Sequence, residues 1–582
     1  MDWTPSGMSR HDYLGIMEPA VVEAAGWLDA QGALIDPVIK SEWRQTTPRF
    51  AASAAVLLHF GRCAELMEPA FRAMSHCCAK LADARRVASE SPDFWLRDLC
   101  AAFECFKGIA PPEMLEKWRA SLASVRSEDT NNYADKTPGR PGVKSMHNWV
   151  VFGMSGESMR ESVGIGGGGN GGGEFLWGHR WIDEYMPHQL RHFTDNGMYR
   201  DPGDPITYDI TTRLQFAAAL AFGYEGPMRG VLEELLRRAN LAMLRFVSPG
   251  GFAPFGGRSS QFNFQEAIIA ALCELEASRY KSASPALAGA FKRQAHVSAR
   301  AIAPWFNAEK PFRHIKNRFP PETRHGCDAY GQYSVYSMLC ASLLGLAALF
   351  ADDAIAEAPA PAEIGGFTLE LAPAFHKIFI NKSGTYVELD TAADPHYDAT
   401  GVGRILFKGY PIQLPLSAPF PSHPKYLLAE GAAAPAEPIA LGPACDSGIM
   451  PEIKISADGS VVSLKWTAPA APEIARPPLT VTVPILLHDG RLRAARHFEG
   501  ATALRVEFEG KSVRYRWSAG LSLEADGTEF ANRNGVYTSI RLSSPSGVVS
   551  LEIGAVQCGA GIQLDARVAK GGSSRWKQRK AL

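Results

Sequence analysis

The sequence lacks the patterns that mark several large classes of protein. Its ten cysteines are scattered, with no C-x-x-C pair and no spacing typical of a secreted disulfide framework, so we expect reduced core thiols in a cytoplasmic protein. The first residues contain no basic stretch followed by an apolar run, and no secretory signal is expected. The most apolar run, 335–350, is about 16 residues long, which is short for a bilayer span and indicates a buried helix.

The sequence also has no excess of positive or negative charge. The formal net charge is -1 over 582 residues, so no nucleic-acid surface is predicted, and no membrane partner is expected. The glycine-rich stretch 164–173 lacks the Lys-Ser/Thr of a phosphate-binding loop and is predicted to be a mobile loop beside the site. No HExxH pattern occurs, so we expect no metal and no cofactor.

The composition that is present is that of a large globular protein. Hydrophobic residues make up 46% and charged residues 21% of the chain, and its length predicts two large domains. From residue 11 to about 350, apolar residues recur at three- and four-residue spacing, and paired helices follow one another, which fits a ring of helical hairpins. The helices expected include 47–60, 69–84, 211–222, 231–246 and 264–280.

The pattern changes after a Pro/Ala-rich stretch at 351–366. Short segments with two-residue alternation and β-branched residues follow, for example 377–380, 461–466 and 548–553, and predict antiparallel strands. The predicted fold class is therefore α+β and multidomain. It comprises an N-terminal (α/α) toroid over 1–352, a linker at 353–366 and a C-terminal antiparallel β-sandwich over 367–582.

The first candidate site segment is His147-Asn148-Trp149, at the start of an apolar, helix-compatible run. His147 can exchange a proton near neutral pH, Asn148 can donate hydrogen bonds to an anion, and Trp149 offers a flat face to a sugar ring. A base beside a neutral anion stabiliser suits proton abstraction next to a carboxylate. The alternative is a buried histidine bonded to backbone, with Trp149 as packing.

The second segment, 192–213, is a polar loop rich in Gly and Pro that leads into a helix from about Thr211. Tyr208 can exchange a proton with a leaving oxygen if a nearby cation lowers its pKa. Arg200 and Arg213 can supply that cation or bind a carboxylate with two hydrogen bonds. The alternative is a turn at 201–204 with Tyr208 packed beneath it.

Two further segments supply binding groups. Arg258 follows a glycine pair and precedes a helix, where it can reach an anion, and Asn263 and Glu266 follow in the first turns. Capping and packing are the alternative roles there. Tyr330 and Tyr336 open the last helix of the predicted toroid and can line a sugar subsite, or simply be amphipathic residues at a helix start.

Taken together, these segments resemble known families. Residues 35–350 resemble a bacterial and fungal family of unknown function with an all-helical toroid; the matching pieces are 147–149, 199–204 with 208–209, 255–260 and 328–336. More distantly, the layout is similar to alginate-lyase-like and heparinase II/III-like polysaccharide lyases. That similarity implies that His147 and Asn148 occupy the Asn/His place and Tyr208 the catalytic Tyr place, and it adds Tyr199 to the binding residues. The sequence departs from the lyases in its His-Asn order and in reading Asp195-Asn-Gly before Tyr208.

The function predicted from these residues is cleavage of uronate-containing poly- or oligosaccharides by β-elimination. Arg258 or Asn148 would neutralise the carboxylate, His147 or Tyr208 would remove the C5 proton, and Tyr208 would protonate the leaving oxygen. One alternative is a glycoside hydrolase, which needs two carboxylates about 5 to 10 Å apart. Its candidates are Asp201, Asp204, Asp209, Glu157 and Glu266. Another is a non-catalytic glycan-binding protein. The expected partner is a carbohydrate, and a cytoplasmic location favours short oligosaccharides over polymers. Homo-oligomerisation is left open.

Overall fold

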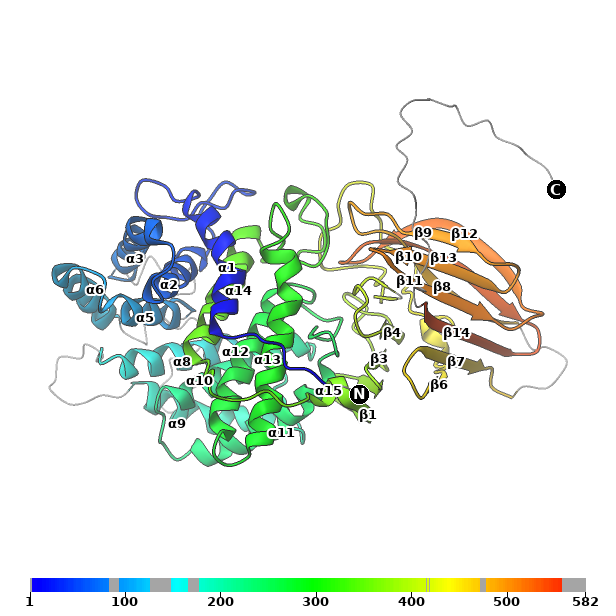
Figure 1. Cartoon of the computed structure of the whole chain (residues 1–582), viewed down its shortest axis with the longest axis horizontal. Coiled ribbons are helices and arrows are strands. Elements are labelled where there is room, and N and C mark those ends of the chain that lie inside the picture. The colour runs from blue at the N-terminus through cyan, green and yellow to red at the C-terminus, as the bar shows by residue number, and fades with distance from the viewer. Residues whose placement is uncertain are drawn as a thin grey trace, which may run out of the picture.

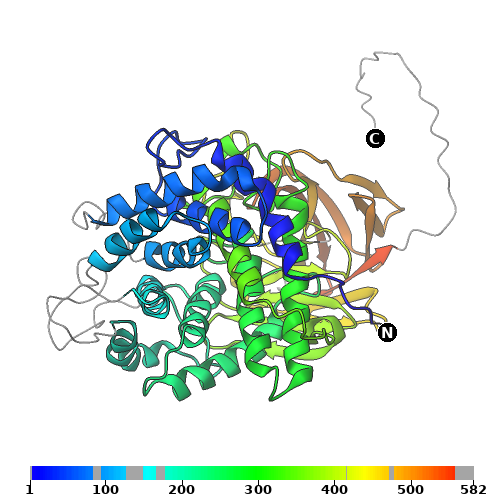
Figure 2. The ribbon, with the colours of Figure 1, turned by 60° about the vertical axis from the view of Figure 1, so that its left-hand side comes forward.

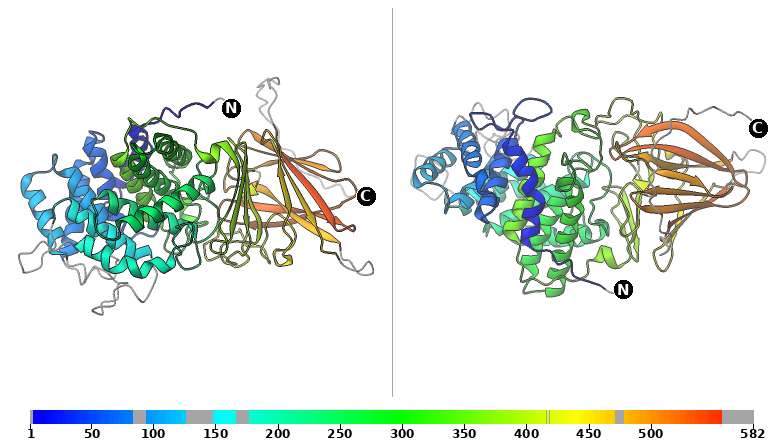
Figure 3. Two further views of the ribbon diagram at one scale, coloured as in Figure 1. Left: turned by 90° about the horizontal axis from the view of Figure 1, so that it is seen from below. Right: turned by 45° about the horizontal axis from the view of Figure 1, so that its top comes forward.

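The computed structural model describes residues 3–82, 94–125, 148–165, 177–414, 416–417, 419–470 and 478–556. Helices fill the N-terminal part and antiparallel sheets the C-terminal part, as the change of sequence period predicts (Figure 1). The two parts lie side by side along the long axis of the molecule (Figure 3). The glycine-rich stretch from 166 and His147 fall outside the described residues.

Six of the helices form a closed ring of neighbours. Each contacts the next, and the last contacts the first, in the order α2, α5, α8, α10, α12, α14. Their bounds are α2 Thr46–His59, α5 Trp95–Phe106, α8 Asn148–Ser162, α10 Ile206–Ala221, α12 Phe264–Tyr280 and α14 Tyr333–Phe350. Most residues of these helices are buried, and apart from a few buried charged pairs, such as Asp209 with Arg213, they are small or apolar.

A second helix packs outside each member of the ring (Figure 2). These are α1 Arg10–Ala25, α3 Met67–Ala82, α6 Pro112–Ser124, α9 Trp177–Gln189, α11 Arg229–Phe246 and α13 Pro285–Phe306. In α3, for example, the buried residues recur at three- and four-residue spacing, from Ala70 to Leu81, while the intervening positions are half-buried or exposed.

The helix α14 is the only one in the described ranges that is long and apolar enough to cross a membrane, and 89% of its apolar window is buried inside the protein. It closes the ring between α2 and α12, and its outer partner is α1. Its apolar character is therefore explained by burial in the helical core, as the sequence predicts.

The C-terminal part contains three antiparallel sheets with strand orders β1-β2-β3-β4-β5, β6-β7-β14-β11-β10-β9 and β12-β13-β8. The first comprises β1 Gly365–Glu370, β2 Lys377–Lys382, β3 Thr385–Asp390, β4 Gly401–Leu406 and β5 Leu416–Ser417. The second comprises β6 Glu452–Ile455, β7 Val461–Thr467, β9 Ala495–Phe498, β10 Ala503–Phe508, β11 Lys511–Trp517 and β14 Val548–Val556. The third comprises β8 Leu479–His488, β12 Ser522–Ala531 and β13 Val536–Ser544.

One apolar core joins these sheets, because residues from all three belong to a single buried cluster. Side chains that alternate between the two faces of each strand build this core. In β7, for example, Val462, Leu464 and Trp466 point inward and their neighbours point outward. The strands β3 and β4 are different, since they are buried on almost every residue. Their second face lies against the helical part, where the Tyr386 hydroxyl donates to the Phe246 carbonyl at the end of α11.

The segment that connects the helical part to the sheets is bound to the helical part by ion pairs. The last ring helix ends at Phe350, a short helix α15 (Pro361–Ile364) follows, and β1 begins at Gly365. Glu357 and Glu363 both bind Arg293 of α13. The predicted change of structure therefore falls within 351–366, although the exact domain bounds stay a prediction.

Candidate functional site

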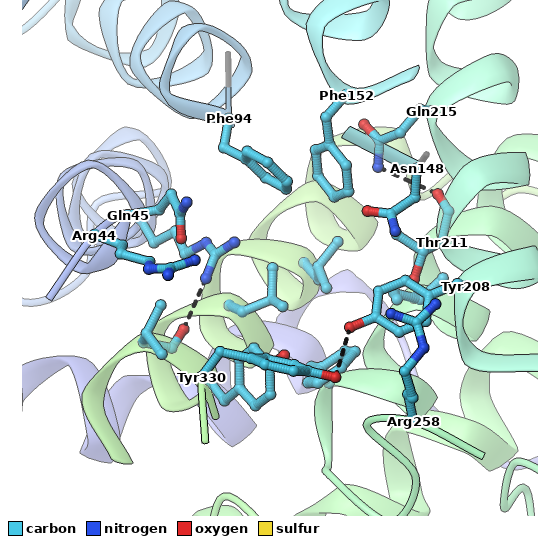
Figure 4. A pocket seen from close by; sticks show the side chains of 17 residues that line it. Arg44, Gln45, Phe94, Asn148, Phe152, Tyr208, Thr211, Gln215, Arg258 and Tyr330 are labelled. Atoms are coloured by element: carbon cyan, nitrogen blue, oxygen red, sulfur yellow. Dashed lines mark hydrogen bonds between the residues drawn. The ribbon is translucent and has the colours of Figure 1, made fainter. Parts of the chain in front are cut away.

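A cavity of about 340 Å³ opens at the N-terminal ends of the ring helices. All six helices, or the residues just before them, contribute to its wall, so the positive ends of six helix dipoles point toward it. The lining residues are Arg44, Gln45, Arg49, Phe94, Asn148, Phe152, Tyr208, Thr211, Gln215, Arg258, Phe264, Ile268, Tyr330, Val335, Tyr336, Leu339 and Leu343. Basic, amide and aromatic groups thus surround a floor of aliphatic side chains (Figure 4).

One side of the cavity is organised by a buried carboxylate, Asp201. It accepts the backbone N–H of Asn148 at 3.0 Å and lies 3.4 Å from the Asn148 amide nitrogen. Its other oxygen forms an ion pair with Arg258, which also donates to the Pro202 carbonyl at 3.0 Å. Asp201 therefore fixes Asn148 and Arg258 beside each other, although they are 110 residues apart in sequence.

The Tyr208 hydroxyl lies in a network of hydroxyl groups. It is 3.0 Å from Ser259 Oγ and 3.4 Å from the Tyr330 hydroxyl, while Ser259 Oγ is 3.2 Å from the Tyr336 hydroxyl. The Arg258 guanidinium stacks on the ring of Tyr208, 4.6 Å from its centre. Asn148, Tyr208, Arg258, Tyr330 and Tyr336, all singled out from the sequence, therefore come together at one cavity.

Two sequence expectations about Tyr208 need correction. It lies in the first turn of α10, which begins at Ile206 directly after Pro205, and not in the loop before it. Burial, followed by the neighbouring Tyr336, raises the pKa of Tyr208 well above its usual value, although Arg258 acts in the opposite direction. The predicted lowering by a cation is thus outweighed, and the phenol stays protonated at neutral pH.

The sheet β1–β5 holds the loop that carries Arg258. Glu388 of β3 accepts the Phe255 N–H at 3.1 Å, Asp398 accepts the Gly257 N–H at 3.0 Å, and Arg404 of β4 donates to the Ala253 carbonyl at 2.9 Å. Gly256 has a φ of +99°, and a Cβ there would overlap the Asp398 carboxylate, so this close approach requires glycine.

The loop also depends on a second buried carboxylate. Asp328 accepts the Ser259 N–H at 3.2 Å and pairs with both terminal nitrogens of Arg533, at 3.0 and 3.1 Å. Arg533 follows β12 and lies over the Tyr426 ring, 4.2 Å from its centre. Ser259 itself has a φ of +56°, a strained value that these contacts maintain.

We expect Asp398→Asn to change how stability depends on pH. Burial, with Asp390 and Glu388 nearby and Lys377 in opposition, raises the pKa of Asp398 to about 7 from an ordinary 3.8. Between these values the folded protein binds more protons than the unfolded chain, so this group lowers stability as pH rises. Asparagine keeps an acceptor for the Gly257 N–H and removes that cost.

The melting temperature of Asp398→Asn should therefore be close to that of the wild type near pH 4, and the variant should gain on the wild type as pH rises to about 7 and then keep that gain to pH 8. Thermal unfolding of both proteins across this range measures the difference. The exposed Asp446→Asn is the matched control and should show a constant difference. A variant that loses stability at pH 8 would mean that the charge of Asp398, and not its acceptor oxygen, holds the loop.

Arg44 and Gln45 lie on the opposite side of the cavity (Figure 4), and Arg49 follows them in α2 and also lines it. The sequence interpretation missed all three. They precede or open α2, whose residues are buried up to Leu58. The signal was present: Arg49 interrupts an otherwise apolar helix, and a buried arginine needs either a partner or a function. The rings of Phe94 and Phe152 lie between the two sides, with centres 4.4 Å apart.

Several other residues predicted to bind substrate lie away from the cavity. Tyr199 is buried, and its hydroxyl donates to Gln189 at 3.1 Å. Arg213 is buried against Asp209, with three hydrogen bonds of 2.7 to 3.1 Å. Arg200 is exposed and pairs with Asp204 at 2.9 Å. Each has its contacts within the protein and none of them lines the cavity, so their expected roles in binding stay predictions from the sequence.

The two residues predicted at the start of α12 also have their contacts within the protein. Asn263 precedes the helix, and its amide donates to the Arg313 carbonyl at 2.6 Å. Glu266 is buried, accepts the Ala253 N–H at 3.0 Å and pairs with Lys316 at 2.6 Å. Neither side chain lines the cavity, and Asn263 makes no side-chain capping hydrogen bond to the helix.

His147 lies outside the described residues, as does the side chain of Trp149, the second residue of α8. Their proposed roles therefore stay predictions from the sequence. Within the described ranges, no cluster of three or more His, Cys, Asp or Glu side chains has the geometry of a metal site.

Comparisons with known proteins give only distant likenesses. No family model and no curated protein matches the chain. Among solved structures, heparinase III is 10% identical with a TM-score of 0.45, covering 96% of this chain and 87% of its own. Heparan sulfate lyase HepC from Pedobacter heparinus is 11% identical with a TM-score of 0.43 for a mutant form, covering 86% of this chain and 77% of its own. Endoglucanase CelQ from Clostridium thermocellum, complexed with cellotriose, is 10% identical with a TM-score of 0.32, covering 94% of this chain and 93% of its own. All three TM-scores are low, so the residues of the cavity must support any functional inference on their own.

Proposed function

We propose that this protein is a carbohydrate-active lyase that cleaves uronate-containing oligosaccharides by β-elimination in the cavity of the helical ring. In this proposal the ring is an (α/α) toroid and the C-terminal sheets form a sandwich that supports its active-site loop. The observation that carries the proposal is the chemistry of the wall: a neutral tyrosine, an amide and arginines, with no carboxylate among the described lining residues.

Elimination needs three groups, and the described residues of the cavity supply candidates for two of them, the anion stabiliser and the proton donor. An anion stabiliser must face the uronate carboxylate so that the C5 proton becomes acidic, and Asn148 and Arg258 are adjacent for that task. A base removes the proton, and we assign His147 from its position next to Asn148 in the chain. The C5–H electron pair then forms the C4=C5 double bond, the C4–O bond breaks, and Tyr208 protonates the departing oxygen.

The hydrolase alternative fits the wall less well. It requires two carboxylates on either side of the bond. The candidates Asp201, Asp209, Glu157 and Glu266 are buried in ion pairs with Arg258, Arg213, Arg160 and Lys316, respectively, and Asp204 pairs with Arg200. These carboxylates are therefore engaged in structural pairs and are not free to act as acid and nucleophile.

The proposal is tested by incubating the protein with a panel of uronate oligosaccharides and following both ultraviolet absorbance and new reducing ends. We expect the two signals to rise together on at least one substrate, because elimination leaves a conjugated double bond. Reducing ends without absorbance would contradict the proposal in favour of hydrolysis. Binding without either signal would favour the non-catalytic glycan-binding protein.

Arg258→Gln should weaken both binding and turnover. The guanidinium would meet the carboxylate in the ground state and in the transition state, so we expect kcat/KM to fall at least about tenfold with a rise in KM. Steady-state kinetics on the active substrate measures this. Arg200→Gln is the matched control, since it removes an exposed arginine of the preceding loop that does not line the cavity. Equal losses in both variants would argue against a specific role for Arg258.

A further inference from the structure

The side of the cavity formed by Arg44 and Arg49 has no role in the elimination proposed above. Asn148, Tyr208 and Arg258 account for the chemistry on the other side, across the aromatic pair Phe94 and Phe152 (Figure 4). A pair of arginines lining a substrate cavity, at the start of an otherwise apolar helix, calls for its own explanation.

Arg49 is a buried cation whose hydrogen bonds are incomplete. Only 4% of its surface is exposed, and it donates one hydrogen bond among the described residues, from Nη1 to the Val335 carbonyl at 3.0 Å. Its Nε is buried without a hydrogen-bond partner, and the nearest carboxylate oxygen, of Asp98, is 4.0 Å away. A buried, charged donor without a hydrogen-bond acceptor lowers the stability of the folded protein unless a bound group supplies the acceptor.

The charges around Arg49 do not balance. Asp98 is already bound by Arg97 at 2.8 Å, so it neutralises one of the arginines that face this region. Burial lowers the pKa of Arg49 to about 10; Asp98 opposes this effect, and Arg97 adds a smaller repulsion. In the described part of the chain, Arg49 and Arg97 therefore share one carboxylate, and a bound anion would restore the balance.

Arg44 adds the second cation without a carboxylate partner among the described residues. Its guanidinium lies over the Trp43 ring, 5.3 Å from the centre, and its side chain lines the cavity next to Gln45. Its backbone has a φ of +41°, which a non-glycine residue adopts only when its surroundings require it. The loop therefore directs a cation toward the cavity at some conformational cost.

We infer that Arg44 and Arg49 form a second anion subsite, which binds an acidic group on the sugar next to the uronate. The inference rests on the proposed function, since Asn148 and Arg258 take the uronate carboxylate itself. The ligand chemistry is an oxyanion, either a carboxylate or a sulfate, because both accept parallel hydrogen bonds from guanidinium groups. The substrate class is thus an oligosaccharide with acidic groups on successive sugars.

The test is a calorimetric binding measurement with the full chain, in a Tyr208→Phe background so that substrate is not consumed. Three uronate disaccharides are compared, whose second sugar is neutral, carries a carboxylate or carries a sulfate. We expect at least one doubly acidic disaccharide to bind about tenfold more tightly than the neutral one, and the better of the two acidic compounds identifies the group.

Arg44→Gln in the same background should abolish that preference and leave affinity for the neutral disaccharide within twofold, whereas Arg44→Lys should retain part of it. The matched control is Lys40→Gln, an exposed cation with a φ of +60° in the same loop that does not line the cavity. The inference would be overturned by equal affinities for all three disaccharides or by no binding at all. It would also be overturned if Arg44→Gln lost the same amount of affinity for all three. If the acidic disaccharides bind more tightly but the protein with Tyr208 intact forms no ultraviolet-absorbing product, elimination is rejected and the subsite is kept. If that protein forms the product but all three disaccharides bind equally, elimination is kept and the subsite is rejected.

Discussion

Tyr208→Phe is expected to lower kcat by on the order of 10²-fold or more while KM changes little. The phenol hydroxyl is the proton donor in the account given above, and its raised pKa keeps it protonated at neutral pH. The ring remains in the variant, so the stacking of Arg258 and the shape of the cavity are retained. A loss in kcat with unchanged KM identifies an interaction made in the transition state.

The measurement is steady-state absorbance on the uronate substrate found by the panel. Tyr280→Phe is the control, because it makes the same change at the far end of a ring helix, outside the cavity. It should keep wild-type activity. Full activity in Tyr208→Phe would exclude this hydroxyl as the donor and would direct attention to Tyr330, the nearest other phenol in the network.

Arg533→Met is expected to cost about 3–5 kcal/mol of stability, because it leaves Asp328 as an unpaired buried charge. Both side chains are 1% exposed, and Asp328 also holds the Ser259 N–H. The variant should therefore loosen the Ser259 loop and lower activity as well as stability. Urea unfolding followed by circular dichroism measures the shift.

Two companion variants separate the buried pair from a general effect of lost charge. Arg541→Met removes an arginine that pairs with Asp526 at 3.2 Å on an exposed surface of the third sheet, and it should cost no more than about 1 kcal/mol. The double variant Asp328→Asn with Arg533→Met should recover part of the stability, since no buried charge remains. A single-variant loss no larger than that of Arg541→Met would show that the pair does not hold the two parts together.

The sequence predicts the elements of the fold well where periodicity is strong. The helix 264–280 and the strands 461–466 and 548–553 lie at or within the observed elements, because burial on one face or all faces imposes a readable pattern. The start of α10 is misplaced by five residues, since Pro205 and the polar residues 207–209 resemble a loop although they form the first helical turn. There, tertiary contacts such as the buried pair of Asp209 with Arg213 overcome weak local preference.

The candidate site shows a similar division. Asn148, Tyr208 and Arg258 carry distinctive chemistry at helix starts, and a ring of helices brings its starts together. Tyr199 and Arg213 have the same chemistry in the same segment but point into the protein, and residue type alone cannot distinguish the two directions. The contributions of Asp398 and Arg533 carry no local signal, because they depend on strands more than 100 residues away from the loop they support.

The most direct test of elimination at this cavity is the mass of the products from one defined uronate tetrasaccharide. Elimination adds no water, so the masses of the two fragments should sum to that of the substrate, with one fragment unsaturated, and the signal should vanish with Tyr208→Phe. Fragments whose masses sum to the substrate plus one water would contradict the account and establish hydrolysis.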